Sequence, residues 1–166
     1  MWELRVSETI LGKAREDGNK IIKNDNATIT YGGIVTGALG TRVVADWLGV
    51  ELEDSVQYDM IDGWLNKTIE VKTKQRKVAP QPHYEASVTT QSLHLLNPDI
   101  FVFVSLLGHR RAYIMGAIEA NEFYEKALPL KQGDYDPSNG YTVKKDCLNI
   151  AYSELGDYDK VATARR

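Results

Sequence analysis

Apolar residues recur at three- and four-residue steps over residues 33–48, and this spacing predicts an amphipathic helix. The apolar positions are Ile34, Val35, Ala38, Leu39, Val43, Val44, Trp47 and Leu48. Gly49 follows directly, as is typical of a helix C-terminus. Residues 1–32 are only weakly periodic, because turn-forming residues interrupt the pattern at 16–19 and 23–26. We therefore expect 1–32 to form an N-terminal arm that is used in dimerisation.

An alternating pattern after this helix predicts two strands of a β-hairpin. Apolar and polar residues alternate over 57–61 and again over 68–73. Residues 62–67 between them contain Asp62-Gly63, which is typical of a turn. Successive side chains of a strand point to opposite faces. The second strand should therefore carry Glu70, Lys72 and Lys74 on one face, and Ile69, Val71 and Thr73 on the other.

The second half of the chain predicts further strands and helices. The run 100–107 is apolar without alternation, which is typical of a strand covered on both faces. The other expected elements are an extended loop at 77–83, a helix at 85–96, a strand at 112–118 and a short helix at 119–126, with 141–143 and 148–152 as alternative candidates for an edge strand. This order predicts an α/β protein with a central mixed β-sheet flanked by helices.

Composition narrows the class of protein. The chain has 166 residues, of which 43% are hydrophobic, so it can bury a core within one domain. Its net charge is −3, so a nucleic-acid partner would have to be held by a local basic patch. The single cysteine, Cys147, excludes a disulfide within one chain and a zinc site of clustered thiolates. The sequence has no signal-peptide pattern and no apolar run of the ~18 residues that span a bilayer. We expect a soluble cytoplasmic protein with no membrane partner.

Two carboxylates and a lysine are expected to meet on the predicted hairpin. Asp59 lies 11 residues before Glu70, so the hairpin can fold it back to Glu70, with Lys72 beside them. Two carboxylates with open coordination positions suit Mg²⁺ or Mn²⁺, which prefer oxygen ligands. A lysine beside the metal can stabilise negative charge that develops on phosphorus, or can position the attacking water. The grouping therefore favours hydrolysis of a phosphodiester.

The motif and the elements around it resemble the PD-(D/E)XK nuclease superfamily over residues 33–118. The resemblance implies a restriction-endonuclease-like core and a Mg²⁺-dependent endonuclease that acts on DNA. It implies that Asp59 and Glu70 bind the metal and that Lys72 assists the attacking water. Gln75, just past the motif, resembles a position where several such families keep Gln, which implies an auxiliary catalytic role.

Two positions depart from the pattern of the superfamily. Tyr58 stands where Pro is common, and it replaces no ligand. Thr41 stands where many members have an acidic residue on the first helix, so the third acidic ligand stays open. Acidic residues near it in the sequence are Asp46 and Glu51. Asp62 is a rival for Asp59, although Asp62-Gly63 fits a turn better.

Basic residues in two places are expected to hold the phosphates of DNA, and these are Lys74, Arg76, Lys77, Arg110 and Arg111. We divide the chain into the arm at 1–32, a catalytic core at 33–118 and a C-terminal extension at 119–166. Analogy with relatives that cut two strands with two copies suggests a homodimer. The alternatives are a non-catalytic DNA-binding module of the same fold, an exonuclease or Holliday-junction-resolvase type of member, and an interaction protein unrelated to nucleic acid.

Overall fold

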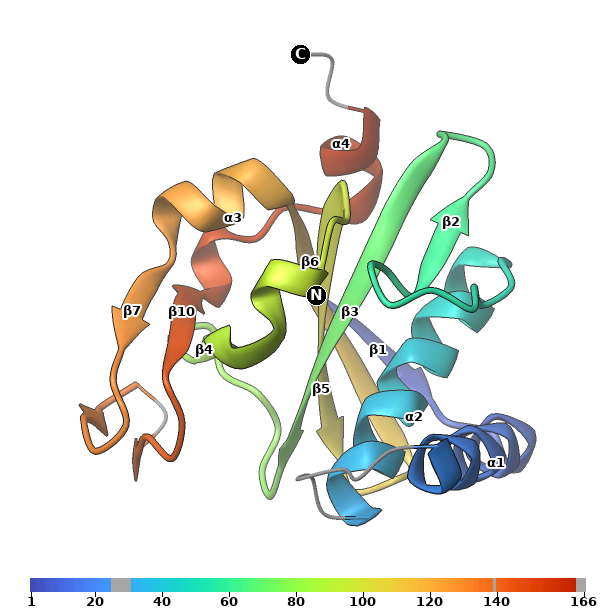
Figure 1. The fold of residues 1–166 in the computed structure, drawn as a ribbon, viewed down its shortest axis with the longest axis horizontal. Coiled ribbons are helices and arrows are strands. Elements are labelled where there is room, and N and C mark those ends of the chain that lie inside the picture. Colours follow the sequence, from blue (N-terminus) through green and yellow to red (C-terminus); the bar gives the residue numbers. More distant parts are fainter. Residues whose placement is uncertain (25–30, 139, 164–166) are drawn as a thin grey trace.

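The computed structural model describes residues 1–24, 31–138 and 140–163, and a five-stranded sheet lies at its centre (Figure 1). The strand order is β1-β6-β5-β3-β2. Strands β3 and β5 are parallel, and the other neighbours are antiparallel. The strands are β1 (Trp2–Arg5), β2 (Met60–Asp62), β3 (Lys67–Arg76), β5 (Ile100–Leu107) and β6 (Arg111–Glu119). The predicted α/β class with a mixed sheet flanked by helices is confirmed.

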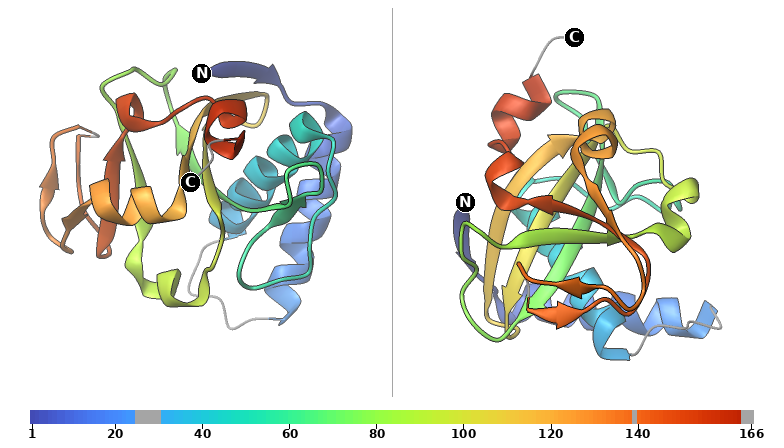
Figure 2. Two further views of the ribbon diagram at one scale, coloured as in Figure 1. Left: turned by 90° about the horizontal axis from the view of Figure 1, so that it is seen from above. Right: turned by 90° about the vertical axis from the view of Figure 1, so that its left-hand side faces the viewer.

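Helices α1 (Glu8–Asn24), α2 (Tyr31–Leu48) and α4 (Tyr158–Thr163) cover one face of this sheet (Figure 2). The buried side chains of α2 pack against Ile69 and Val71 of β3, as the period of its apolar residues predicted. Gly40 permits this close approach, because a Cβ atom there would overlap the Thr73 side chain. None of the described helices is both long and apolar enough to cross a membrane.

A smaller sheet and further helices cover the other face. The strand order of the smaller sheet is β4-β10-β7, and β8 and β9 form a separate pair. The elements are β4 (Glu85–Thr89), the 3-10 helix η1 (Thr90–Leu95), α3 (Ala120–Lys126), β7 (Leu128–Leu130), β8 (Tyr135–Asp136), β9 (Tyr141–Thr142), β10 (Cys147–Ala151) and the 3-10 helix η2 (Tyr152–Glu154).

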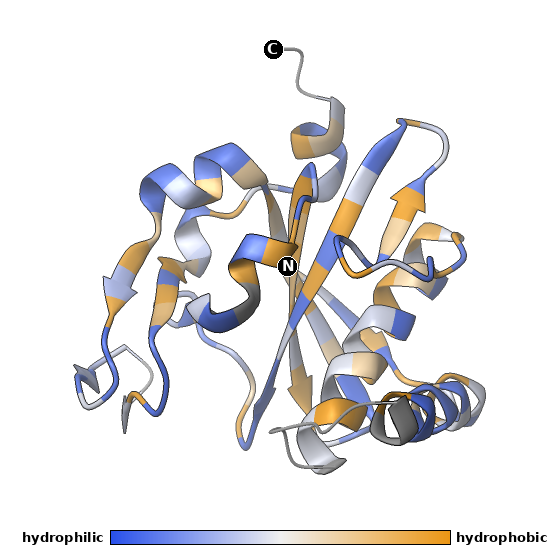
Figure 3. Cartoon of the chain, in the orientation of Figure 1, coloured by the Kyte–Doolittle hydropathy of each residue, from blue (hydrophilic) through white to orange (hydrophobic). Residues whose placement is uncertain are grey.

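Strand β5 lies between two apolar clusters, and Figure 3 shows the hydrophobic colouring along the central strands. Val102 and Val104 face the helices α1 and α2, whereas Phe101 and Phe103 face α3 and the smaller sheet. Both sets are buried. The prediction of a strand covered on both faces is therefore confirmed.

The N-terminal segment differs from the expected arm, because its described part belongs to the main sheet and core. Strand β1 pairs with β6, and α1 continues through the predicted turn at 16–19. Gly18 packs closely on Val35 of α2, and Asp17 binds Arg42 of α2 with oxygen-to-nitrogen distances of 2.6 and 3.0 Å. These contacts with α2 override the turn preference of the local sequence. The predicted turn at 23–26 lies partly outside the described residues.

The predicted helix at 85–96 is wrong, because this segment is β4 followed by η1. Ala86 and Val88 are buried alternately on one face of β4, where they pack into the second cluster. Strand β4 pairs with β10, with Val88 opposite Leu148. Its partner is thus 60 residues away in the sequence, so the local pattern does not reveal the pairing. Strand β10 is the middle strand of its sheet, where an edge strand was expected.

Candidate active site

The hairpin of β2 and β3 places Asp59 against the middle of β3. Strand β2 is shorter than predicted and pairs through Met60 opposite Ile69. Just before it, the Asp59 N–H donates to the Ile69 carbonyl oxygen at 2.8 Å. The Asp59 Oδ2 atom accepts a hydrogen bond from the Val71 N–H at 2.7 Å. The carboxylate of Asp59 therefore continues the pairing with β3 and is held beside Glu70.

Asp62 has a structural role in this hairpin. Its Oδ1 atom accepts hydrogen bonds from the N–H groups of Trp64 and Leu65 at 3.0 and 3.2 Å. Its Oδ2 atom accepts a hydrogen bond from the Tyr158 hydroxyl of α4 at 2.7 Å. Asp62 is buried and closes the turn, as its sequence context indicated.

Glu70 and Lys72 form an ion pair on one face of β3. The Lys72 Nζ atom lies 2.7 Å from the Glu70 Oε1 atom. The Glu70 residue is only 8% exposed, and the Lys72 side chain is 23% exposed. Ile69 and Val71 point into the helix-covered core on the opposite face. The predicted alternation of faces is therefore confirmed for this part of β3.

Asp59 and Glu70 line the same cavity, which has a volume of about 340 Å³ and lies between β3 and the helices α1 and α2. Apolar or small residues form most of its remaining wall. The other lining residues are Asp17, Ile21, Gly33, Ile34, Gly37, Ala38, Thr41, Leu52 and Val71. The cavity thus presents two neighbouring carboxylates in a largely apolar setting.

This setting changes the acidity of Asp59. Burial, and then the negative charge of Glu70, raise the pKa of Asp59 to about 7. The hydrogen bond from the Val71 N–H and the charge of Lys72 act in the opposite direction and offset only part of this. Two carboxylates that repel one another form a site at which a cation is electrostatically favoured.

Of the candidates for a third acidic residue, neither Asp46 nor Glu51 lies in the cavity of Asp59 and Glu70. Thr41 lines the cavity, and its hydroxyl donates to the Gly37 carbonyl oxygen at 3.2 Å. Asp46 and Glu51 line a different cavity, away from Asp59. Asp17 of α1 does line the site, and both of its oxygens are bound to Arg42. Within the described part of the chain, no three His, Cys, Asp or Glu side chains are grouped closely enough to hold a metal ion.

The sequence analysis missed two residues beside the pair. Asp17 was missed because α1 was expected to break at this point. Tyr124 of α3 has its ring centroid 6.0 Å from that of Phe101, which is opposite Glu70 in the register of β3 and β5. Burial and the charge of Glu70 raise the pKa of Tyr124. No local signal identifies Tyr124, because the fold brings it to Glu70 from a distant helix.

The predicted site residues further along β3 lie outside this cavity. The Oε1 atom of Gln75 accepts a hydrogen bond from the Thr36 hydroxyl of α2 at 3.1 Å. Arg76 donates to the Glu85 carbonyl oxygen at 3.2 Å and to the Tyr152 hydroxyl at 3.0 Å. The Lys74 Nζ atom is buried. Gln75 is therefore not brought to the carboxylates, and Lys74 and Arg76 lie beneath the smaller sheet, away from the cavity of Asp59 and Glu70.

The remaining basic residues are exposed but distant from Glu70. Lys77 is exposed just after β3. Arg110 and Arg111 lie at the turn between β5 and β6, and they pair with Glu8 at 3.2 Å and Glu3 at 3.8 Å. The register places the end of β5 beside the end of β3, which is about 20 Å from Glu70 at the usual rise per residue. These residues therefore lie apart from the cavity of Asp59 and Glu70.

The fold and site define an α/β protein with a carboxylate pair and a paired lysine at the side of a mixed sheet. No protein-family model matches the sequence, and no curated protein is significantly similar to it. The function is therefore inferred from the geometry of the site and from the sequence motif.

Proposed function

We propose that this protein is a metal-dependent nuclease that hydrolyses phosphodiester bonds in DNA. The observation that carries the proposal is the meeting of Asp59 and Glu70 in one cavity, with Lys72 bonded to Glu70 at 2.7 Å. These are the three residues that the resemblance to the PD-(D/E)XK superfamily assigns to catalysis. The mixed sheet with helices on both faces is compatible with the core that the resemblance implies.

The donor set fits Mg²⁺ or Mn²⁺. Asp59 and Glu70 would hold the ion, because Mg²⁺ is commonly bound through one or two carboxylates and keeps several waters. Burial, and then repulsion from Glu70, raise the pKa of Asp59, and a cation bound between the two carboxylates would relieve that repulsion. When bound, the ion supplies positive charge against the phosphate and favours ionisation of water.

The residues of the chain have distinct tasks in this proposal. The Val71 N–H fixes the Asp59 carboxylate, and Lys72 fixes one oxygen of Glu70. The Lys72 ammonium also places positive charge where negative charge develops on the phosphate in the transition state. Such a fixed charge is most effective in a partly buried site, because little water screens it there.

Cleavage assays test the proposal. The wild-type protein should cut plasmid DNA, or a member of a panel of linear, branched and single-stranded DNAs, with Mg²⁺ or Mn²⁺ and not with a chelator. Lys72→Ala should lower the rate by roughly a hundredfold or more, because it removes charge stabilisation in the transition state. Its circular dichroism spectrum should barely change.

Lys67→Ala is the matched control, because Lys67 is on the same strand but opposite Asp62 in the hairpin. It should cut at the wild-type rate. Wild-type-like cutting by Lys72→Ala would refute the role of the lysine. A wild-type protein that cuts none of the DNAs but gives a salt-sensitive gel shift would instead be a non-catalytic DNA-binding module.

A further inference from the structure

A second cavity borders Lys74, on the face of β3 that carries Glu70 and Lys72 and that the smaller sheet covers. Its volume is about 440 Å³, and β3, β4, β9, β10 and the turn before β10 form its wall. Three of its lining residues are lysines. The lining residues are Lys74, Ser87, Thr89, Tyr141, Lys144, Lys145 and Cys147. The proposed cleavage chemistry uses none of them.

Lys74 is the unusual residue of this cavity. Its Nζ atom is buried, and it has no hydrogen-bond acceptor among the residues that the structure describes. It lies 4.9 Å from the centroid of the Tyr141 ring. Burial, and then the positive charge of Arg76, lower the pKa of Lys74 to about 8. A buried ammonium without an acceptor is costly unless an anion pairs with it.

The two carboxylates whose charges act on Lys74 are hydrogen-bonded to Asn149. Asp136 and Glu85 interact with Lys74 through their charges. The Asn149 amide donates to the Asp136 Oδ2 atom at 3.0 Å and to the Glu85 Oε2 atom at 2.9 Å. These charges favour the ammonium form of Lys74, but they leave its donors without an acceptor.

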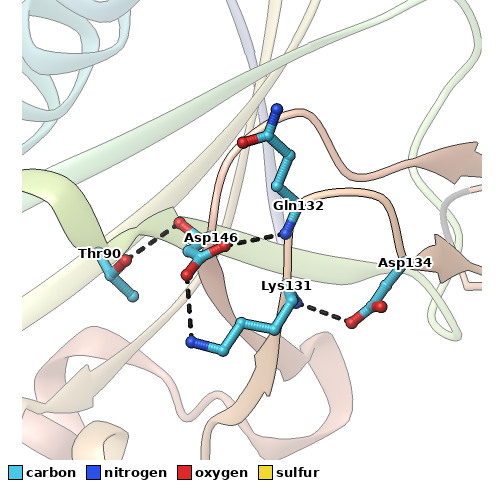
Figure 4. Close-up of polar contacts among 5 residues, drawn as sticks. All are labelled: Thr90, Lys131, Gln132, Asp134 and Asp146. Atoms are coloured by element: carbon cyan, nitrogen blue, oxygen red, sulfur yellow. Dashed lines mark hydrogen bonds and ion pairs between the residues drawn. The ribbon is translucent and has the colours of Figure 1, made fainter.

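Lys144 and Lys145, at the rim of the cavity, precede Asp146, which holds this segment in place through the hydrogen bonds shown in Figure 4. The side chain of Asp146 accepts from the Gln132 N–H at 2.9 Å and from the Lys131 Nζ atom at 3.1 Å. Its carbonyl oxygen accepts from the Thr90 N–H at 3.0 Å. Lys144 and Lys145 directly precede this residue and are exposed. The anchoring therefore holds two exposed ammonium groups at the mouth of a cavity that has a third inside.

We infer that this cavity binds a phosphate group, with Lys74 as the inner contact and Lys144 and Lys145 at the rim. Ammonium groups suit phosphate as point charges, and hydroxyls such as those of Ser87 and Thr89 can donate to its oxygens. Lys72 and Lys74 are alternate residues of one strand, so their Cα atoms are about 7 Å apart. We assign this phosphate to a DNA strand whose scissile bond lies at Asp59 and Glu70, and this assignment rests on the proposed function.

Binding assays in a chelator test this inference without cleavage. The probes are inorganic phosphate, followed by calorimetry, and a fluorescent single-stranded DNA 12-mer, followed by anisotropy. Lys74→Met keeps the length of the side chain and removes its charge, and should weaken phosphate binding about tenfold or more. Lys144→Gln combined with Lys145→Gln should weaken it several-fold. The matched control is Lys13→Gln combined with Lys160→Gln, two exposed lysines outside the cavity, which should bind phosphate as the wild type does.

The outcomes separate the sources of the phosphate. Weaker binding of both probes by the variants supports a nucleic-acid phosphate. Weaker binding of inorganic phosphate alone supports a free phosphate-bearing molecule and removes the link to DNA. Absence of saturable phosphate binding, or equal binding by both cavity variants and the wild type, overturns the inference. If Lys74→Met does not fold, phosphate binding by the variant with Lys144→Gln and Lys145→Gln decides whether the cavity is the binding site. Because no metal is present, these results are independent of whether the protein cleaves DNA.

Discussion

The first half of β3 and its second half carry charged residues on the same face, but different elements cover them. Glu70 and Lys72 border the cavity that Asp59 lines, and they pair with each other. Lys74 and Arg76 lie under β4, η2 and the strands near them, where Arg76 contacts the Tyr152 hydroxyl and the Glu85 carbonyl oxygen. One alternating pattern therefore supplies a candidate catalytic pair at one end and interior contacts at the other.

The difference arises from the neighbours of β3. On the side of Glu70, β2 has only three residues, so the Asp59 carboxylate takes the next hydrogen bond of the strand. On the side of Arg76, the parallel partner β5 continues through Leu107. The Tyr152 hydroxyl bonds there to Arg76 of β3 and to Ser105 of β5. Where β2 ends, Asp59 and Glu70 therefore border a cavity, whereas Arg76 lies under a second sheet and bonds to polar groups there.

Among the variants proposed here, Arg76→Ala should have the largest effect on stability. It removes hydrogen bonds to the carbonyl oxygen of half-buried Glu85 and to the buried Tyr152 hydroxyl, which keeps its hydrogen bond with Ser105. We expect a loss of about 2–4 kcal/mol in the free energy of unfolding. Urea denaturation followed by fluorescence measures it.

Arg111→Ala is the matched control, because this arginine is exposed and its ion pair with Glu3 has a distance of 3.8 Å. It should change the free energy of unfolding by less than about 0.5 kcal/mol. Comparable losses in the two variants would show that the contacts of Arg76 do not stabilise the fold.

Much of the main sheet was predictable from the sequence, because its signals are local. The continuous apolar run of β5 and the three- and four-residue period of α2 each specify their element. The role of Asp62 was also predictable, since Asp followed by Gly is typical of a turn. The proximity of Asp59, Glu70 and Lys72 was predictable as well, because the hairpin that joins them is a local structure.

What the sequence did not predict depends on distant contacts. Strand β4 was expected to be a helix because its partner β10 comes much later in the chain. Arg76 and Lys74 were expected to contact DNA phosphates, but the smaller sheet that covers them was not predicted, because alternation specifies a face of a strand and not the layer that covers it. Asp17 and Tyr124 reach the site only through the packing of α1 and α3.

The environment of Asp59 should make the stability of the protein depend on pH. The pKa of Asp59 is raised to about 7 in the folded protein, above its ordinary value of 3.8. The folded state therefore binds this proton more tightly than the unfolded state does, so the contribution is stabilising at low pH and is lost as pH rises from about 4 to 7. We expect a loss of about 1–3 kcal/mol from this group over that range, because the side chain is only partly exposed.

Asp59→Asn isolates this contribution from the other groups that titrate. The variant should not lose this contribution as the pH rises. Its free energy of unfolding should therefore increase relative to that of the wild type with increasing pH. Urea denaturation at pH 4.5, 5.5, 6.5 and 7 measures it. A difference that stays constant over these values would mean that Asp59 is ionised in the folded protein throughout, and that Glu70 does not raise its pKa.

The smallest expected effect is a shift in melting temperature that tests the carboxylate pair directly. In a chelator, Asp59→Asn should melt about 2–6 °C above the wild type at pH 7.5, because it removes one of two neighbouring negative charges and keeps the shape of the side chain. Adding Mg²⁺ or Mn²⁺ should raise the melting temperature of the wild type, since the ion binds only the native state. The variant should lose most of this shift, because Thr41 offers no carboxylate in place of Asp59.

The control is Asp46→Asn, which changes a carboxylate in a different cavity and should keep the full metal-induced shift. An equal metal-induced shift in Asp59→Asn and the wild type would mean that Asp59 is not a ligand. Asp17 would then be the carboxylate to replace next, because it lines the same cavity and needs only to release Arg42.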